Sequence, residues 1–334
     1  MASLEHVIVI GASAGGVNAL LTIAGQLPPA FPAAVCIVQH IGRNPSLLPK
    51  LLRFRGSNPA EHVKDGDRLV SGMLYVAPPD CHILVRGDSL HLSRGPKENY
   101  ARPAIDPLFR SAALSHGPRV IGVLLTGQMD DGTAGLQAIK DCGGTVVVQD
   151  PATAEEPEMP RNALKHVAVD HCVPLDRIAP LLMRLVHRAP ATAPPVPPRL
   201  AKEVAINEGA ATVQQLEGIA TPSTLTCPDC GGTLWEMKEH RPLRYRCHTG
   251  HAFSPVSLAR AQQEVAEEAL WNAVRALRER EILLRRLAAV ATGLGETGQA
   301  SASVAEADRL HAQADALEEM AAGQRPVEPV NAAA

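Results

Sequence analysis

The chain opens with an apolar run that ends abruptly in a turn rich in glycine. Val7 to Ile10 are four consecutive β-branched residues, which is typical of a buried parallel strand. The letters GASAGG follow, and apolar residues recur at helical spacing from Val17 onward. A strand, a tight turn and a helix place the turn at the carboxyl edge of a sheet, where open α/β folds bind their ligands.

The same alternation of strand-like and helix-like segments continues to residue 187. It predicts a doubly wound, largely parallel sheet covered by helices, so the expected fold class is α/β. Residues 63–92 differ, because short apolar runs separated by Gly and Asp predict a small β-meander inserted in this frame. Residues 119–125 have the composition of a further buried strand, and the letters TGQMDDG after it predict a second sharp turn.

A change of composition near residue 190 marks the end of the α/β region. Five prolines between residues 190 and 198 predict an extended linker, which suits a tether better than a fixed domain contact. A lid that folds back over the Ser13 edge is the alternative, and a short helix is expected around residues 201–216. Beyond it come a cysteine cluster and a stretch rich in Ala, Leu, Glu and Arg that predicts a helical hairpin. We expect five parts: an α/β domain over 1–188, a proline-rich linker over 189–222, a small cysteine-containing module over 223–256, a helical hairpin over 257–322 and a disordered tail over 323–334.

Composition and charge narrow the classes of function. Hydrophobic residues make up 46% of the 334 residues, enough for a sizeable core, whereas aromatic residues make up only 3%. Few aromatic rings and a net charge of -3 disfavour nucleic-acid binding, which relies on stacking and on cationic surfaces. No apolar run is long enough to span a membrane, and the first strand begins too early to leave room for a signal peptide. Together with the pattern of cysteine usage, these features predict a cytoplasmic protein.

Three residues with complementary chemistry stand at the ends of predicted strands. Ser13 follows the first strand, His40 follows the second, and Asp131 lies in the turn after residues 119–125. The carboxyl ends of parallel strands share one edge of a sheet, so these side chains can converge although they are far apart in sequence. A serine hydroxyl becomes a nucleophile when an imidazole takes its proton, and a buried carboxylate fixes that imidazole. The three residues therefore form a chemically complete catalytic set.

Other interpretations of the same residues are open at this stage. Ser13 can serve only as a helix cap, His40 as a packing residue at a strand end, and Asp131 as a turn former before glycine. The glycine turn could also bind a dinucleotide, a function that usually requires an acidic residue at the end of the second strand. Gln39 and His40 stand there instead, which disfavours a nucleotide-dependent oxidoreductase.

The motifs of the α/β region resemble those of one enzyme family. GASAGG, VQHI, YVAPPDCHILV, RPAIDPLF, LLTGQMDDGTAG and MPRNAL occur in that order between residues 6 and 187, as in the catalytic domain of the CheB-type chemotaxis methylesterases. The resemblance implies a protein-glutamate methylesterase of phosphorelay signal transduction, an activity that in the family extends to glutamine deamidation, with methylated chemoreceptor helices as the partner. It also implies that Ser13, His40 and Asp131 are the catalytic triad and that catalysis needs no cofactor.

The resemblance assigns three further residues to the oxyanion and substrate site. Ala14 stands after the nucleophile where the family usually carries Thr, and Gln128 replaces the Met of the family's TGM motif. That Met is implied to lend a backbone N–H to the oxyanion hole, and a backbone donor survives a change of side chain. Arg102 lies in a matching motif and could meet an acidic receptor surface or form a structural salt bridge. The family's receiver domain has no counterpart before residue 6, so we expect no gating by phosphorylation.

A second group of reactive side chains lies in the C-terminal half. Cys227 and Cys230 form a CxxC pair, and Cys247 and His251 follow it. Three thiolates and an imidazole suit tetrahedral zinc, and a site closed by four protein ligands has a structural role. His248 is the alternative fourth ligand, and unpaired surface cysteines are the alternative to metal binding. The cluster and the helical hairpin also resemble an extension of receiverless members of the family.

Two functions of different classes compete on the sequence alone. The first is an ester hydrolase that acts on methylated signalling proteins. The second is a catalytically weak or inactive scaffold that keeps the esterase fold and docks a signalling partner. Ser13, His40 and Asp131 favour the enzyme, whereas Ala14 and Gln128 keep the scaffold open.

Overall fold

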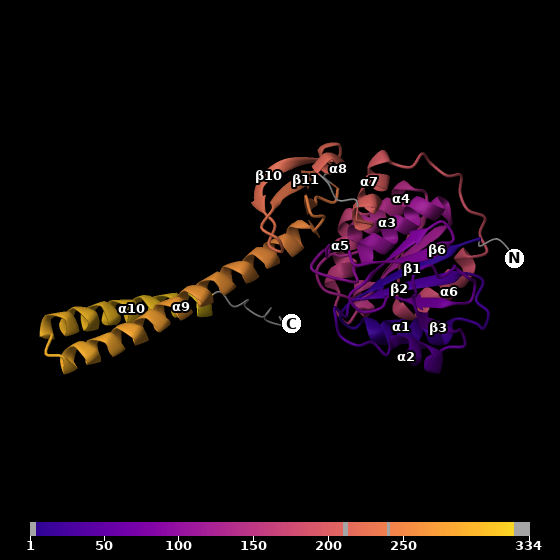
Figure 1. Ribbon diagram of the computed structural model, residues 1–334. Helices are drawn as coiled ribbons and strands as arrows, with labels where there is room; N and C mark the ends of the chain where they lie inside the picture. The colour runs from indigo at the N-terminus through magenta and orange to yellow at the C-terminus, as the bar shows by residue number, and fades with distance from the viewer. Residues whose placement is uncertain (1–4, 210–212, 239–240, 324–334) are drawn as a thin grey trace. The chain divides into compact units, whose positions relative to one another are not determined.

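The computed structural model describes residues 5–209, 213–238 and 241–323. Its contacts divide the chain into two compact units, Met1–Leu258 and Ala259–Ala334. The first unit holds a parallel sheet with its helices and a small antiparallel sheet, and the described residues of the second form a helical hairpin. Figure 1 shows the elements coloured along the chain.

A parallel sheet forms the centre of the first unit (Figure 1). Within the described residues it has seven strands in the order β3-β4-β2-β1-β7-β8-β9, and every neighbouring pair runs parallel. The predicted α/β fold with a largely parallel sheet is therefore confirmed. The strands are β1 (Val7–Ala12), β2 (Ala34–Gln39), β3 (Ala60–His62), β4 (Leu74–Val76), β7 (Val120–Leu124), β8 (Thr145–Gln149) and β9 (His171–Val173).

Helices cover both faces of this sheet. Side chains alternate between the two faces along each strand, so each strand contributes to both cores. Ile8 and Ile10 belong to the core on one face, and Val7 and Val9 belong to the core on the other. Burial on both faces explains why the β1 run is apolar throughout. The first core includes residues of α1 (Gly16–Gln26), α2 (Leu48–Arg55) and α6 (Leu175–Leu185). The second core includes residues of α3 (Ile105–His116), α4 (Thr133–Asp141) and α5 (Glu158–His166). Two short 3-10 helices, η1 (Gly117–Arg119) and η2 (Pro151–Thr153), lie in the connecting segments.

The inserted β structure is smaller than the meander predicted over residues 63–92. β4, which lies in that range, pairs with β2 and β3 in the main sheet, where Leu74 and Val76 are buried in the core. β5 (His82–Arg86) and β6 (Ser89–Ser93) form a separate antiparallel hairpin. The hairpin packs against α3, where Ser111 Oγ accepts a hydrogen bond from the amide of Val85.

The segment predicted to be a linker over residues 189–222 contains regular structure. α7 (Pro198–Asn207) lies within it and packs against α3. Leu200 and Val204 of α7 belong to the same core as the apolar side chains of α3. This part of the segment, where a short helix is expected beyond the prolines, is therefore fixed on the α/β domain.

A small antiparallel sheet, which we call the ribbon (residues 220–253), follows α7. Its strand order over the described residues is β10-β11-β12-β13. A minor core joins Ile206 of α7, Leu216 of α8 and Met237 of the ribbon, so the ribbon is packed against the helices that lead into it. The elements are α8 (Val213–Glu217), β10 (Ala220–Thr226), β11 (Thr233–Met237), β12 (Tyr245–Cys247) and β13 (Ala252–Phe253).

Buried ion pairs between charged side chains join the ribbon to the α/β domain. Arg246 of β12 donates to Glu98 at 2.8 Å, and Glu98 also pairs with Arg110 of α3. Arg244 donates to both carboxylate oxygens of Glu203 in α7. Each of these five residues is at most 9% exposed. Because a buried charge without a partner is costly, these pairs favour a docked ribbon.

The predicted helical hairpin is confirmed. α9 (Pro255–Gly293) begins in the first unit and continues in the second, and α10 (Thr297–Gly323) returns along it. Buried alanines recur every seven residues on α10, and ion pairs such as Arg278 with Asp315 link the two helices. Among the described residues, none of the helices combines the length and the apolar character that crossing a bilayer requires. The predicted disordered tail, apart from residue 323, lies outside the described residues.

Candidate active site

Three loops at the carboxyl edge of the parallel sheet hold Ser13, His40 and Asp131. Ser13 follows β1, His40 follows β2, and Asp131 lies between β7 and α4. β1 pairs with both β2 and β7, so the loops that follow these parallel strands meet at one edge. The structure therefore brings together the three side chains for which the sequence predicts catalysis.

The imidazole of His40 connects the other two side chains. Its Nδ1 lies 3.1 Å from Ser13 Oγ, and its Nε2 lies 2.7 Å from Asp131 Oδ2. An ionised carboxylate only accepts hydrogen bonds, so Nε2 carries the hydrogen and Nδ1 is left to accept the serine proton. Asp131 is 2% exposed, whereas His40 and Ser13 are half-buried. The Ser13 hydroxyl is therefore accessible and the charged end of the arrangement is buried.

The start of α3 holds the carboxylate of Asp131. Its Oδ2 accepts a hydrogen bond from the amide of Ile105 at 2.7 Å, and its Oδ1 accepts from the amide of Gly132 at 2.9 Å and from Asn99 Nδ2 at 3.0 Å. Free amides at a helix N-terminus favour negative charge. Burial opposes ionisation, but the hydrogen bond from His40 and these donors outweigh it and hold the pKa of Asp131 below its ordinary value. Asp131 therefore stays ionised, as the partner of an imidazolium must.

Two more carboxyls lie close to Asp131. Burial and the charge of Asp131 raise the pKa of Asp106 to about 7. Burial also raises the pKa of Asp130 to about 6, although Ser254 Oγ donates a hydrogen bond to it at 2.6 Å. Neighbouring carboxylates disfavour each other's ionisation. Of the three, Asp131 is the one whose contacts favour the charged form.

Close packing fixes the turn that presents Ser13. The Ser13 amide donates to the carbonyl of Thr126 at 3.0 Å, and the Ser13 carbonyl accepts from Gln39 Nε2 at 2.8 Å. A Cβ added at Gly127 would lie 2.7 Å from Ser13 Cβ, so a larger residue there would displace Ser13. Gly15 has a φ of 74°, a left-handed conformation that glycine adopts without steric cost. The glycines of both motifs therefore serve the shape of this turn.

Ala14 and Gln128, which the resemblance assigns to the oxyanion and substrate site, are exposed. Gln128 follows Gly127, which packs on Ser13, so both residues border the nucleophile. In the described part of the chain, neither amide N–H donates to a protein acceptor. The next amide, that of Met129, is fixed by Glu158 at 2.9 Å. Two unengaged N–H groups beside a nucleophile are what an oxyanion hole requires.

Arg102 is engaged within the domain. Its Nε and Nη2 donate to Oδ1 of Asp80 at 2.9 and 2.8 Å, and its Nη1 donates to the carbonyls of Arg94 and Gly95. The hydrogen bond from Arg102 lowers the pKa of Asp80. These contacts favour the structural salt bridge over the receptor-binding role, the two interpretations that the sequence leaves open.

Sequence reasoning missed three residues that support the site. Asn99 and Asp106 lie around the carboxylate of Asp131, and Gln39 holds the carbonyl of Ser13. Asn99 is 32 residues from Asp131, and no periodicity connects such positions. One available signal was Gln39, a polar residue directly at the end of an apolar run.

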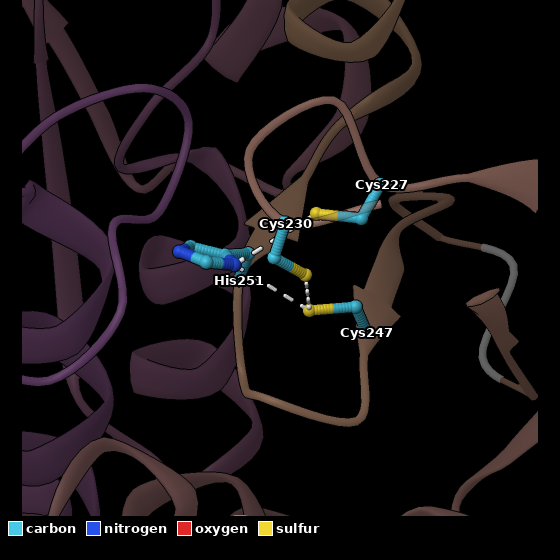
Figure 2. Close-up of side chains that lie close together, drawn as sticks. All are labelled: Cys227, Cys230, Cys247 and His251. Atoms are coloured by element: carbon cyan, nitrogen blue, oxygen red, sulfur yellow. Dashed lines mark hydrogen bonds between the residues drawn. The ribbon is translucent and has the colours of Figure 1, made fainter. Parts of the chain in front are cut away.

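A separate cluster of ligand-type side chains lies in the ribbon (Figure 2). The ligand atoms of Cys227, Cys230, Cys247 and His251 lie within 4.8 Å of one another and point toward a common centre. Cys230 Sγ lies 3.7 Å from Cys247 Sγ, and His251 Nδ1 lies 3.5 Å from Cys247 Sγ and 3.8 Å from Cys227 Sγ. A zinc ion with Zn–S bonds of about 2.3 Å spaces its tetrahedral ligands by roughly 3.5–3.8 Å. The donor set therefore fits zinc, and among the described residues His248 is not part of this group.

Comparison with known protein families shows to which family the chain belongs. The model of the family described as CheB methylesterase matches residues 8–182, more than half of the 334 residues. The chain belongs to the CheB methylesterase family. It is accordingly an enzyme of a carboxylic ester hydrolase family, and the resemblance of the motifs is confirmed. The match ends before α7, the ribbon and the helical hairpin.

Individual members of the CheB methylesterase family support this placement. A Leptospira interrogans protein, provisionally named protein-glutamate methylesterase/protein-glutamine glutaminase, is 43% identical over 184 residues, 53% of this chain and 93% of the relative. The protein-glutamate methylesterase/protein-glutamine glutaminase 2 of Methanosarcina mazei is 37% identical over 193 residues, 55% of this chain and 53% of the relative. The chain thus spans about half the length of the second relative. The crystal structure of the Thermotoga maritima CheB methylesterase catalytic domain matches 54% of this chain and 98% of that chain, with a TM-score of 0.52 and 31% identity.

Proposed function

We propose that this protein is a protein-glutamate methylesterase that hydrolyses glutamyl γ-methyl esters on chemoreceptor-like signalling proteins by a Ser-His-Asp mechanism. The observation that carries the proposal is the pair of hydrogen bonds that join His40 to Ser13 at 3.1 Å and to Asp131 at 2.7 Å. The names of the relatives support both this activity and a glutaminase activity at the same site.

In the first half of the reaction, Ser13 Oγ attacks the ester carbonyl while His40 Nδ1 takes the hydroxyl proton. The Nε2–H of the imidazolium stays bonded to Asp131, whose charge stabilises it. The amides of Ala14 and Gln128 hold the oxyanion of the tetrahedral intermediate. His40 then gives its proton to the methoxy oxygen, methanol departs, and the glutamyl group remains esterified to Ser13.

In the second half, water attacks the glutamyl ester of Ser13 while His40 takes a proton from it. The bond to Ser13 Oγ breaks, the hydroxyl regains its proton, and the receptor side chain leaves as a carboxylate. A glutamine side chain follows the same path with ammonia as the leaving group in place of methanol. The mechanism requires no cofactor.

The exposure of the site supports a protein substrate. Ala14 and Gln128 are exposed, and Ser13 and His40 are half-buried, so a flexible side chain on the surface of another protein can reach the nucleophile. We infer that methylated receptor helices, or a similar methylated signalling protein, supply that side chain. We also infer a cytoplasmic location in a phosphorelay pathway, with which the seven free thiols of the structure are compatible.

We further infer that the ribbon binds one structural zinc ion. The Sγ atoms of Cys227, Cys230 and Cys247 and the Nδ1 of His251 would hold it. Four protein ligands leave no position for a reactive water, so the ion would stabilise the ribbon and take no part in ester hydrolysis.

Release of methanol from methylated receptor helices tests the proposed activity. The wild-type chain should release methanol, Ser13→Ala should release none, and Ser57→Ala, which changes an exposed serine of the same domain, should match the wild type. Binding of the helices without methanol release would contradict the proposal and support the scaffold function instead.

A further inference from the structure

Asn99 connects the carboxylate of Asp131 with the segment that ends the ribbon. Its Nδ2 donates to Asp131 Oδ1 at 3.0 Å. Its Oδ1 accepts hydrogen bonds at 3.0 Å from the amide of Ser254 and from the hydroxyl of Ser257. Asn99 and Ser254 are 7% exposed and Ser257 is 1% exposed. One buried amide side chain thus joins the catalytic carboxylate to a part of the chain that lies outside the family match.

Backbone contacts make the same connection. The Asn99 amide donates to the carbonyl of Ala252 in β13 at 2.8 Å, and the Ala252 amide donates to the carbonyl of Lys97 at 3.3 Å. The adjacent Glu98 pairs with Arg246 of β12. The loop that carries Asn99 is therefore held by the ribbon on its main chain and on its side chains.

The conformation of this loop depends on its surroundings. Asn99 and Tyr100 have φ values of 48° and 68°, and two consecutive non-glycine residues in the left-handed region need contacts that compensate for their cost. The Tyr100 ring packs edge-on against the Phe253 ring of β13, with 6.2 Å between the ring centroids. The ribbon thus supplies contacts that stabilise the conformation in which Asn99 reaches Asp131.

We propose that Asn99 is a positioning residue for Asp131 and that residues 252–257 hold Asn99 in place, so that ester hydrolysis depends on a docked ribbon. This inference rests on the proposed function of Ser13, His40 and Asp131. Asn99 makes no contact with the nucleophile. It fixes Oδ1 of the carboxylate, and the orientation of the carboxylate in turn fixes Nε2 of His40.

By holding Asp131 in a fixed orientation before the reaction, Asn99 is expected to raise the rate at which Ser13 reacts. Without the hydrogen bond from Asn99, the carboxylate of Asp131 loses one of its donors and can rotate away from His40 Nε2. An imidazole that is less well oriented takes the proton of Ser13 more slowly. Since Asn99 lies on the far side of the carboxylate, the loss should appear in the maximal rate and not in the binding of the substrate.

Labelling of Ser13 by a fluorophosphonate measures the competence of the nucleophile without a natural substrate. The Ser13 Oγ–P bond forms, the P–F bond breaks, fluoride leaves, and His40 takes the serine proton. Asn99→Gly accommodates the left-handed backbone and removes the side chain that donates to Asp131 without adding a charge beside it. Ser257→Ala removes one donor to Asn99. The matched control is Ser223→Ala, which removes a hydroxyl bonded to the Leu234 carbonyl within the ribbon.

We expect Asn99→Gly to lower the maximal labelling rate about ten- to a hundredfold, the range for loss of a buried hydrogen bond to a charged group. The half-saturating concentration of the probe should stay unchanged. Ser257→Ala should slow labelling by about two- to tenfold, and Ser223→Ala should react like the wild type. The double variant Asn99→Gly/Ser257→Ala should be no slower than Asn99→Gly, because the serine acts through the asparagine.

Two results would overturn the inference alone: labelling of Asn99→Gly at the wild-type rate, or losses that add in the double variant. Absence of labelling in the wild type would instead overturn the proposed function, and the inference with it. Thermal melting of each variant identifies any chain that fails to fold. Asn99→Ala, which also lacks the donor to Asp131, then replaces Asn99→Gly and should show the same loss of rate.

Discussion

The Nε2 atom of His40 lies 2.7 Å from Oδ2 of Asp131, and this contact decides which imidazole nitrogen acts as the base. Since Nε2 carries the hydrogen that the carboxylate accepts, the free lone pair is on Nδ1, 3.1 Å from Ser13 Oγ. The amide of Ile105 anchors the buried end of this arrangement. Substitution of Ser13, His40 or Asp131 should therefore lower the rate of ester hydrolysis strongly. Substitution of a neighbouring residue outside these hydrogen bonds should lower it only slightly.

Removal of the nucleophile gives the simplest prediction. Ser13→Ala should lower the rate of methyl ester hydrolysis at least about a thousandfold, because only the oxyanion hole and substrate binding remain. The substitution barely changes side-chain volume, so the melting temperature should stay within about 2 °C of the wild type. Methanol release and calorimetry check the two parts separately. Residual hydrolysis near the wild-type rate would assign the nucleophile to another residue.

Asp131 and Asp130 can be distinguished by matched substitutions. Asp131→Asn should reduce the rate about a thousandfold or more, because an amide favours the wrong tautomer of His40. Asp130→Asn should cost less than about tenfold, since Asp130 bonds to Ser254 and not to the imidazole. Hydrolysis rates of both variants, measured at the same pH, provide the check. The reverse ranking would mean that Asp130 is the catalytic carboxylate.

Gly127 tests the packing of the two glycine-rich turns. A methyl group there would lie 2.7 Å from Ser13 Cβ and 2.6 Å from Met159 Cε, so Gly127→Ala should displace the nucleophile and lower the hydrolysis rate at least about tenfold. Gly25→Ala is the matched control, because its added carbon meets its nearest neighbour, Arg55, at 3.4 Å on a helix. The control should retain full activity and gain up to about 1 kcal/mol of stability. Equal activity of both variants would show that the turn tolerates displacement.

Zinc binding is checked by mass spectrometry under native conditions. The wild-type chain should carry one zinc ion, and Cys227→Ser or Cys247→Ser should carry none. The alternative ligand is tested by His248→Ala, which should keep the ion, whereas His251→Ala should lose it. Retention of zinc in His251→Ala with its loss in His248→Ala would reverse the assignment of the fourth ligand.

Loss of the metal should also lower the melting temperature of the first unit. Metal binding contributes to the folding free energy of small metal-binding modules, and the ribbon shares the buried pair of Arg246 with Glu98. We expect Cys227→Ser to melt about 5–10 °C below the wild type. Cys172→Ser, which changes an exposed cysteine of the α/β domain, is the control. An unchanged melting temperature in Cys227→Ser would show that the ribbon folds without the metal.

The stability of the protein in acid should depend on Glu98 and Glu203, the buried carboxylates that pair with Arg246 and Arg244 of the ribbon segment. Burial opposes ionisation of both groups, but Arg110 and Arg246 hold the pKa of Glu98 well below its ordinary value, and Arg244 lowers the pKa of Glu203 to about 2. A carboxyl with a depressed folded pKa adds stability above its unfolded pKa, and that stability is lost as the pH falls toward the folded value. The free energy of unfolding should therefore fall between about pH 4.5 and pH 2, by roughly 1–3 kcal/mol for each carboxyl.

Urea titrations at several pH values measure this dependence. Glu203→Gln should be less stable than the wild type at neutral pH, because Arg244 loses a charged partner. It should also show a weaker pH dependence below pH 4.5, since one linked carboxyl is gone. Glu61→Gln, at an exposed position, should keep the wild-type slope. A slope in Glu203→Gln that equals the wild-type slope would contradict the assignment.

The sequence by itself determined the frame of the protein and the positions of its reactive groups. Ser13 and His40 lie within three residues of the ends of apolar runs, and the end of such a run marks the carboxyl end of a strand. Because parallel strands end at one edge, the convergence of these residues with Asp131 could be predicted without coordinates. The spacing of Cys227 and Cys230 is similarly local, since both lie on one short turn of the ribbon. Features of this kind depend on a few neighbouring residues and on general rules of strand arrangement.

The tertiary structure alone decided that the ribbon is docked and that Asn99 supports Asp131. The prolines after residue 189 predict a tether, yet Glu98 pairs with Arg246 across 148 residues and Asn99 bonds Ser254 across 155. Glu and Arg are usually exposed, so their identity does not reveal that these are buried. An ion pair or an amide bridge between distant segments forms only where packing excludes water and aligns both partners. No spacing or period in the chain encodes that alignment, because it arises from the way the folded segments fit together.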